Sequence, residues 1–355
     1  MTVELPAAAL RAEHWRRHVA GLARHPRLAT LDDAALAARL AAAPADGTSA
    51  ADSSSNPPGL ARVAWFGPTD DRRDPWLAND VAAAVLRHAE RTCYLVGSAA
   101  IAARRAGRLR LHHATYGEYH SLCRDDPFWE QPVALERIGD APTDFGYTGY
   151  LVDPQTVLTC WHGWDHFSSR AQVAVFGYAR RDAASDPLEL PVSQVLPVAA
   201  RPASDPGAAP RVAGGAAHPR GGSPRDWVLL RLEHPVTHLG ALAPPALALP
   251  RAGRAVYTLG YPCGLPLKLA DHARVLEAEG GSFRSDLDTF TGNSGSPVFD
   301  AASHALVGMV LEGQKDEGDF EPVPARGCYV ARQVGRHVVG QLGVTTAAFA
   351  AAVTR

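Results

Sequence analysis

The 355-residue sequence lacks long apolar runs. No stretch of about 18 apolar residues occurs, so we expect no membrane-spanning helix. The first residues include Glu4, Arg11 and Glu13, and they contain no apolar core of signal-peptide length. These gaps predict a cytoplasmic protein, with a secreted protein as the alternative.

An excess of charge of one sign is also missing. The net charge is −2, and the positive charge is nearly all arginine, since Lys268 and Lys315 are the only lysines. Nucleic-acid-binding domains and proteins that bind anionic membranes usually carry a basic excess. The charge therefore gives no reason to expect either kind of partner.

Paired cysteine motifs are absent as well. The number of cysteines is odd and none of them forms a Cys-x-x-Cys pair. A zinc site and a full set of disulfides are therefore not expected. Unpaired thiols are typical of a reducing compartment. The five cysteines are Cys93, Cys123, Cys160, Cys263 and Cys328.

Local sequence patterns divide the chain into three parts. Residues 1–44 predict a helical extension of two short helices, because residues 7–25 place apolar side chains at spacings of three and four. Residues 45–59 are rich in Ser, Asp, Asn and Pro and predict a linker. Residues 60–355 contain short apolar runs separated by Gly, Pro and Asp, which is typical of an all-β domain.

Within the all-β part we expect three exceptions. Residues 80–106 are rich in Ala and Arg and favour a helix, residues 197–225 predict a long surface loop, and residues 335–354 predict a closing helix. The expected strands are 92–96, 148–152, 157–159, 172–176, 227–232, 255–259, 296–299 and 306–311.

Residues 286–299 hold a candidate nucleophile, Ser294, in the sequence Gly-Asn-Ser-Gly-Ser-Pro. A serine hydroxyl needs a base to remove its proton and donors to hold the oxyanion that forms. Gly292 and Gly295 permit a tight turn that directs several N–H groups at one point, which suits an oxyanion hole. The alternative is an ordinary turn between two strands.

Two further residues are candidates for the base and its acid. His162 follows an apolar run, and a histidine at a strand end can be held by packing yet stay open on one side. Asp226 directly precedes an apolar strand, where a buried carboxylate needs a partner such as a histidine N–H. Taken singly, His162 could be a turn residue and Asp226 a turn cap.

The order of the three candidates is more informative than each alone. His162, Asp226 and Ser294 follow one another at separations of 64 (226 − 162) and 68 (294 − 226), in the order of a chymotrypsin-type triad. An α/β-hydrolase would need Gly-x-Ser-x-Gly with acid and histidine downstream, but position 296 is serine and the candidates lie upstream.

With these motifs the sequence resembles bacterial chymotrypsin-fold serine peptidases of the trypsin-like and V8-like (glutamyl-endopeptidase-like) branch. The similar segments span residues 60–345. They are Asp70-Asp71-Arg72, Phe128-Trp129-Glu130-Gln131-Pro132, Leu158-Thr159-Cys160-Trp161-His162, Asp226-Trp227-Val228-Leu229-Leu230-Arg231-Leu232, Gly260-Tyr261-Pro262-Cys263-Gly264-Leu265-Pro266 and Gly292-Asn293-Ser294-Gly295-Ser296-Pro297.

The resemblance implies an all-β fold of two six-stranded antiparallel β-barrels, one over about 120–235 and the other over about 250–335, with a helical N-terminal extension and a C-terminal helix. It implies that His162 is the base, Asp226 orients it, and Ser294 attacks the peptide carbonyl. The N–H groups of Gly292 and Ser294 would form the oxyanion hole. No metal or organic cofactor is implied, and the substrate is a protein or peptide.

The resemblance also bears on specificity and on the thiols. Asp288, six residues before Ser294, stands at the base of the pocket for the residue that precedes the cut, with Thr289, Glu312 and Gly313 beside it, and an acid there suits arginine or lysine. Asp288 could instead be structural. Cys123 and Cys328 lie where secreted relatives often carry disulfide cysteines, but the mate expected near 147–149 is absent, which favours a reduced protein.

Three functions are thus in competition. The first is an intracellular endopeptidase whose N-terminal helices recruit a partner, which it could activate by a single cut. The second is a non-catalytic peptide-binding module with the same fold. The third is a secreted glutamyl-endopeptidase-like protease, against which Val310 counts, because glutamyl endopeptidases carry a pocket histidine there.

Overall fold

The computed structural model describes most of the chain from residue 65 onward. The expected N-terminal helices of 1–44, the linker 45–59 and nearly all of the 197–225 loop lie outside the described residues. None of the helices described has the length and apolar character needed to cross a membrane. The described ranges are 65–66, 70–138, 141–167, 171–199, 226–312, 319–334 and 340–354.

The first barrel is a six-stranded antiparallel sheet in the order β13-β11-β2-β9-β10-β14. Its two edge strands meet where Val198 bridges to Leu232, and the N–H of Ala199 donates to the carbonyl of Arg231 at 2.8 Å. This contact curls the sheet into a barrel. The strands are β2 (Thr92–Gly97), β9 (Tyr147–Asp153), β10 (Thr156–Thr159), β11 (Gln172–Phe176), β13 (Val195–Pro197) and β14 (Val228–Arg231).

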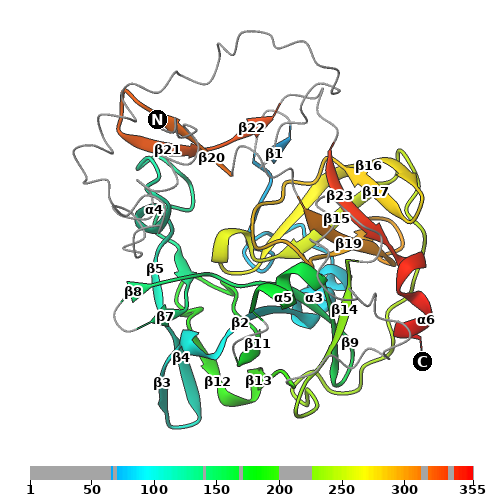
Figure 1. Ribbon diagram of the computed structural model, residues 1–355, viewed down its shortest axis with the longest axis horizontal. Helices are drawn as coiled ribbons and strands as arrows, with labels where there is room; N and C mark the ends of the chain where they lie inside the picture. Colours follow the sequence, from blue (N-terminus) through cyan, green and yellow to red (C-terminus); the bar gives the residue numbers. More distant parts are fainter. Residues whose placement is uncertain are drawn as a thin grey trace, which may run out of the picture.

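The second barrel is closed, in the order β15-β16-β17-β23-β19-β18, and it lies beside the first (Figure 1). The two barrels confirm the all-β fold expected from the sequence. The strands are β15 (Ala255–Gly260), β16 (Lys268–Glu279), β17 (Ser282–Ser285), β18 (Pro297–Asp300), β19 (Leu306–Glu312) and β23 (Gln341–Thr345).

Both barrels extend beyond the limits expected from the sequence. The first begins at β2 and not near residue 120, because β2 pairs with β9 and β11 in its centre. The second ends at Thr345, because β23 pairs with both β17 and β19 and closes the barrel. The expected helix over 335–354 is therefore confined to the last residues, as the turn η4 (Thr346–Ala348) and α6 (Ala350–Val353).

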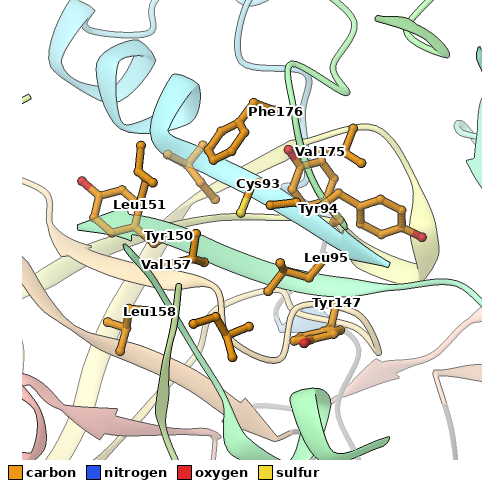
Figure 2. Close-up of a cluster of buried hydrophobic side chains, with 14 of the residues drawn as sticks. Cys93, Tyr94, Leu95, Tyr147, Tyr150, Leu151, Val157, Leu158, Val175 and Phe176 are labelled. Atoms are coloured by element: carbon orange, nitrogen blue, oxygen red, sulfur yellow. The ribbon is translucent and has the colours of Figure 1, made fainter. Parts of the chain in front are cut away.

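The barrels are covered by a few short helices. The expected helix in 80–106 is α3 (Ala83–Arg91), which buries Val85 and Ala89 against the first barrel and leads directly into β2. The core inside is rich in tyrosine (Figure 2). Buried tyrosines need partners for their hydroxyl groups. Tyr94, for example, donates to the carbonyl of Ala134 at 2.8 Å and accepts from the N–H of Gly146 at 2.6 Å.

A long insertion lies between β2 and β9, and none of its strands belongs to either barrel. The insertion begins with the turn η1 (Ser98–Ala100). One of its strands, β4 (Arg108–Leu111), pairs with β12 (Glu189–Pro191), a strand outside the insertion that leads into the turn η2 (Val192–Gln194). The other elements of the insertion are β3 (Ile101–Arg105), β5 (His113–Thr115), α4 (Tyr116–His120), β6 (Pro132–Ala134), β7 (Arg137–Ile138) and β8 (Ala141–Pro142).

The second barrel carries its own addition between β19 and β23. It is the hairpin of β20 (Phe320–Val323) and β21 (Cys328–Ala331), followed by β22 (Gln333–Val334), which pairs with β1 (Trp65–Phe66). The hairpin and α4 lie side by side in Figure 1, and Leu122 bridges to Tyr329. A separate apolar cluster fills their junction and includes Tyr116, Leu122 and Phe290.

A disulfide between Cys123 and Cys328 locks this junction, with Cα atoms 5.0 Å apart. The expectation of a fully reduced protein is therefore wrong. The partners are 205 residues apart and both lie in additions to the barrels, so no local pattern could pair them. Cys93, Cys160 and Cys263 are buried free thiols.

Candidate active site

The candidate acid and base are in direct contact. The Nδ1 atom of His162 lies 2.7 Å from Oδ2 of Asp226, and the backbone N–H of His162 donates to Oδ1 of Asp226 at 3.0 Å. One carboxylate therefore fixes both the ring and the backbone of the histidine. Asp226 lies two residues before β14, which pairs with β10, and His162 lies in α5 (Trp161–Phe167) just after β10.

The surroundings of His162 favour its protonated form. Burial alone would lower the pKa of the imidazole, but the neighbouring Cys160 side chain and the hydrogen bond and charge of Asp226 outweigh burial and raise the pKa above its ordinary value. The pKa of Asp226 is lowered despite its burial, since it accepts hydrogen bonds from His162. The His162 side chain keeps 27% of its surface exposed, so one side of the ring remains open to a substrate.

Trp161, a bulky residue, lies directly beside the histidine. It packs against Trp164, at 4.9 Å between ring centroids, and partly against the core. Cys160 is fully buried and fills space against Gly163, in keeping with a packing role. The bulk of Trp161 is therefore accommodated without displacing His162 from Asp226.

The Ser294 turn is attached to the first barrel through Thr148 of β9. The hydroxyl of Thr148 donates to the carbonyl of Gly292 at 2.7 Å, and its N–H donates to the carbonyl of Ser294 at 3.0 Å. The carbonyl of Thr148 accepts a bond from the hydroxyl of Thr159, at the end of the strand that leads to His162. Thr148 thus joins the strand of the candidate base to the turn of the candidate nucleophile.

The two glycines that flank Ser294 are needed for this close approach. Gly292 has φ +95° and Gly295 φ +87°, a region where other residues are strained. A side chain on Gly295 would collide with the carbonyl of Thr148 and with Thr159, so the turn packs directly on the histidine-bearing strand. The sequence-based reason for the glycines, a tight turn, agrees with the observed geometry.

Two of the four residues predicted for specificity, Asp288 and Thr289, are fully described by the structure. Asp288 and Thr289 are each only 3% exposed. Oδ2 of Asp288 accepts a hydrogen bond from the N–H of Asp71 at 2.9 Å. Glu312 ends β19, but its side chain and all of Gly313 lie outside the described residues.

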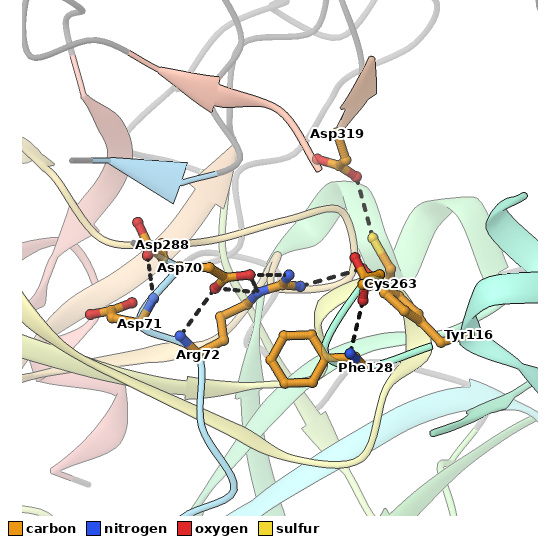
Figure 3. A network of polar contacts seen from close by, with 9 residues as sticks. Asp70, Asp71, Arg72, Tyr116, Phe128, Cys263, Asp288 and Asp319 are labelled. Atoms are coloured by element: carbon orange, nitrogen blue, oxygen red, sulfur yellow. Dashed lines mark hydrogen bonds and ion pairs between the residues drawn. The ribbon is translucent and has the colours of Figure 1, made fainter. Parts of the chain in front are cut away.

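The segment that contacts Asp288 is itself anchored by a buried arginine (Figure 3). The Arg72 guanidinium bonds to Asp70, lies 3.6 Å from the centre of the Phe290 ring and 4.8 Å from that of Phe128. Arg73 then pairs with Leu269 of β16. The residues before the first barrel therefore line the second barrel beside the stretch that leads to Ser294.

Among the described residues no group of three His, Cys, Asp or Glu side chains is arranged to hold a metal ion. The described polar groups are instead a pair on the first barrel, His162 and Asp226, and the glycine turn of Ser294, which Thr148 joins to that barrel. That set of groups can move a proton and can stabilise an oxyanion.

A family model described as a trypsin-like peptidase domain matches residues 147–309. The matched stretch includes His162, Asp226 and Ser294. Residues 147–309 are therefore similar to a trypsin-like peptidase domain. The insertion before β9 and the β20–β21 hairpin lie outside the matched stretch.

Several solved structures are similar to this chain. One is an inactive Ser343Ala mutant of Rv3671c from M. tuberculosis H37Rv, with 13% identity, a TM-score of 0.39, and coverage of 79% of this chain and 92% of that chain. Another is mouse neuropsin, a serine protease, with 15% identity, a TM-score of 0.39, and coverage of 59% and 88%. A third is Deg5, with 13% identity, a TM-score of 0.35, and coverage of 64% and 82%. No curated protein matches the sequence.

Sequence reasoning missed two residues that shape the site. The sequence identifies Thr148 only as part of the expected strand 148–152, and it assigns no role to Asp319. The N–H of Thr291 donates to Oδ2 of Asp319 at 3.0 Å. A buried threonine in a strand is a weak signal, since its hydroxyl usually finds a partner. Asp319 gave no signal, because its partner is a backbone group 28 residues away.

Proposed function

We propose that the protein is a serine endopeptidase that cleaves peptide bonds through an acyl-enzyme. The observation that carries the proposal is the contact of His162 with Asp226 beside the Ser294 turn, with one side of the imidazole exposed. The family match supports a protein or peptide substrate.

The proposed mechanism assigns one role to each group. His162 takes the proton of the Ser294 hydroxyl while the serine oxygen bonds to the substrate carbonyl carbon, and Asp226 stabilises the imidazolium. The N–H groups of Gly292 and Ser294 hold the oxyanion. His162 then gives the proton to the leaving amine. A water molecule then attacks the acyl-enzyme while His162 takes its proton, and the acid product leaves as the Ser294 oxygen regains a proton from His162.

A fluorophosphonate probe tests the proposal directly. We expect covalent labelling of the wild-type chain, loss of labelling in Ser294→Ala, and full labelling in the control Ser98→Ala, since Ser98 is an exposed serine of the turn η1. A folded wild-type chain that is neither labelled nor able to cleave a peptide library would contradict the proposal and favour the non-catalytic peptide-binding module.

The finer part of the proposal is a preference for arginine or lysine before the cut. It is supported by a buried carboxylate, Asp288, six residues before the nucleophile. The Asp71 hydrogen bond uses one of its oxygens, so the same carboxylate also holds the preceding segment. We expect Asp288→Asn to lower kcat/KM for arginine substrates by about tenfold or more, a loss of about 1.4 kcal/mol or more. Cleavage by the wild type only after acidic or apolar residues would contradict the preference.

Two proposals concern the setting of the enzyme. The N-terminal residues 1–58 recruit a partner that the peptidase activates by a single cut. If deletion of these residues left the activity, the partner binding and the oligomeric state unchanged, this proposal would be contradicted.

The protein acts in the cytoplasm, although the Cys123–Cys328 disulfide removes the cysteine argument for that compartment. Cell fractionation tests the location.

A further inference from the structure

The inference concerns how the proposed oxyanion hole keeps its shape, and it rests on the proposed peptidase function. The Gly292 N–H belongs to the peptide group that begins with the carbonyl of Thr291. In a planar trans peptide the C=O and the N–H point in opposite directions. No peptide bond in the described residues is cis. The direction of the Thr291 carbonyl therefore sets the direction of the Gly292 N–H.

The Thr291 carbonyl is held by the turn η3 (Pro262–Gly264) of the second barrel. The N–H of Cys263 donates to this carbonyl at 2.5 Å. The carbonyl thus points toward η3, and the Gly292 N–H points away from it. If this peptide rotated, the hole would present a carbonyl oxygen in place of a donor and would repel an oxyanion.

The backbone of the η3 turn is strained at Cys263. Cys263 has φ +50° although it is not glycine, a conformation that costs on the order of 1 kcal/mol and persists only where neighbours impose it. Its side chain is fully buried. Burial and the nearby Asp319 charge raise the pKa of the Cys263 thiol, so it remains protonated and can donate.

One carboxylate oxygen contacts both partners of this peptide hydrogen bond. Oδ2 of Asp319 accepts from the N–H of Thr291 at 3.0 Å. It also accepts from Sγ of Cys263 at 3.5 Å (Figure 3). Asp319 therefore holds Thr291 from its N–H side while Cys263 holds it from its carbonyl side. The three residues form a closed set of contacts directly before Gly292.

Asp319 is in turn fixed by the additions to the two barrels. It comes directly before β20, and the β20–β21 hairpin is tied to the insertion by the Cys123–Cys328 disulfide. The ion pair between Arg326 and Asp125, at 2.6 Å, joins the same two parts. The insertion thereby supports a contact that ends one residue before the proposed oxyanion hole.

We propose that Asp319 is a positioning residue that keeps the Thr291–Gly292 peptide in the orientation in which the Gly292 N–H faces the developing oxyanion. The residue touches no reacting atom. It acts by accepting the Thr291 N–H and the Cys263 thiol.

The test compares Asp319→Ala with Asp319→Asn in the full chain. We expect the alanine variant to lose about 10- to 100-fold in kcat, somewhat less than the loss of an oxyanion-hole donor itself, while KM stays within about twofold. Its affinity for a peptide aldehyde, which forms a tetrahedral adduct with serine, should fall by a similar factor. The asparagine variant keeps an acceptor oxygen at the same reach, so its kcat should stay within about threefold of the wild type.

Glu321→Ala is the matched control, because Glu321 lies on β20, two residues after Asp319, and pairs only loosely with Arg332, at 3.6 Å. It should leave kcat and aldehyde affinity unchanged. Circular dichroism checks folding, and if Asp319→Ala does not fold, Asp319→Ser replaces it, since its shorter side chain cannot reach the Thr291 N–H. A purely structural role would lower Tm without moving kcat or aldehyde affinity.

The outcomes separate the inference from the function on which it rests. A labelled, active wild type whose alanine or serine variant keeps kcat within twofold would overturn the role of Asp319 alone, as would a folded asparagine variant that is as impaired as the alanine variant. A wild type that is neither labelled nor active would overturn the peptidase proposal and the inference with it.

Discussion

The hydroxyl of Thr148 donates to the carbonyl oxygen of Gly292 at 2.7 Å, so a strand of the first barrel holds the Ser294 turn of the second. The same hydroxyl accepts the N–H of Tyr261 at 3.1 Å, and the side chain is fully buried. The two barrels are therefore fastened together at the site itself. An acid–base pair on one barrel and a nucleophile on the other need such a contact to keep their relative positions.

Thr148→Val should disrupt this attachment. The change keeps the shape of the side chain but leaves the Gly292 carbonyl and the Tyr261 N–H buried without a partner, at a cost of about 1–3 kcal/mol for each group. We expect a loss of about 2–4 kcal/mol in the free energy of unfolding, measured by urea denaturation, together with reduced peptidase activity. Thr148→Ser retains the hydroxyl and should recover most of both. A valine variant with wild-type stability would contradict the role of the hydroxyl.

The pH dependence of activity should report the His162–Asp226 pair. Since His162 must be neutral to take a proton and its pKa is raised in the folded protein, kcat/KM should rise with pH through a midpoint above about 6.5, the ordinary histidine value. Asp226→Asn removes the charge that stabilises the imidazolium. The midpoint should therefore move to lower pH, and the activity should fall by as much as about 10⁴.

His166→Asn is the control for this profile. His166 lies on the same helix and pairs with Asp144 at 2.8 Å on the surface, away from Asp226. Its replacement should leave the midpoint in place. An unchanged midpoint in Asp226→Asn, measured by the rate of fluorophosphonate labelling, would show that another group controls the profile.

Gly295→Ala should be far more damaging than a comparable change elsewhere. Gly295 and Gly253 have similar φ values, +87° and +80°, but only Gly295 has the Thr148 carbonyl where a Cβ would stand. Gly253→Ala should cost about 1 kcal/mol from backbone strain. Gly295→Ala adds the collision, so we expect loss of labelling and a lower Tm by several degrees more than in Gly253→Ala. Equal effects of the two changes would show that the close packing on β9 is unimportant.

Removal of the disulfide should loosen the junction of the two additions. Cys123→Ser with Cys328→Ser should lower the free energy of unfolding by about 2–5 kcal/mol. The matched control is Cys93→Ser, a buried thiol of the first barrel that forms no disulfide and whose effect reports packing alone. Detection of both Cys123 and Cys328 as free thiols in the unreduced, purified protein would contradict the pairing.

The sequence predicts the parts of the candidate site that lie in short, recognisable motifs. His162, Asp226 and Ser294 each lie within three residues of the end of an apolar strand, and the strand pairing of β10 with β14 brings the first two together. It could not predict contacts made across long separations by polar groups without a motif. Thr148 reaches Gly292 across 144 residues, and Asp319 acts on a backbone N–H.

The same distinction explains the errors in the fold. The sequence predicts a strand at β2, but it does not indicate that this strand belongs to the first barrel, because a long insertion separates β2 from its partner β9. Residues 341–345, Gln-Leu-Gly-Val-Thr, follow a glycine and were merged into the closing helix. They are a strand because Val344 is fully buried between β17 and β19, and that is a tertiary cause.

The 205-residue separation of Cys123 and Cys328 also affects how the chain is made. At synthesis rates of about 5–20 residues per second, Cys123 precedes its partner by about 10–40 s. Cys160 and Cys263 are synthesised within that interval, and in the folded protein both are buried free thiols. Correct pairing therefore depends on the barrels enclosing these two thiols before Cys123 is oxidised.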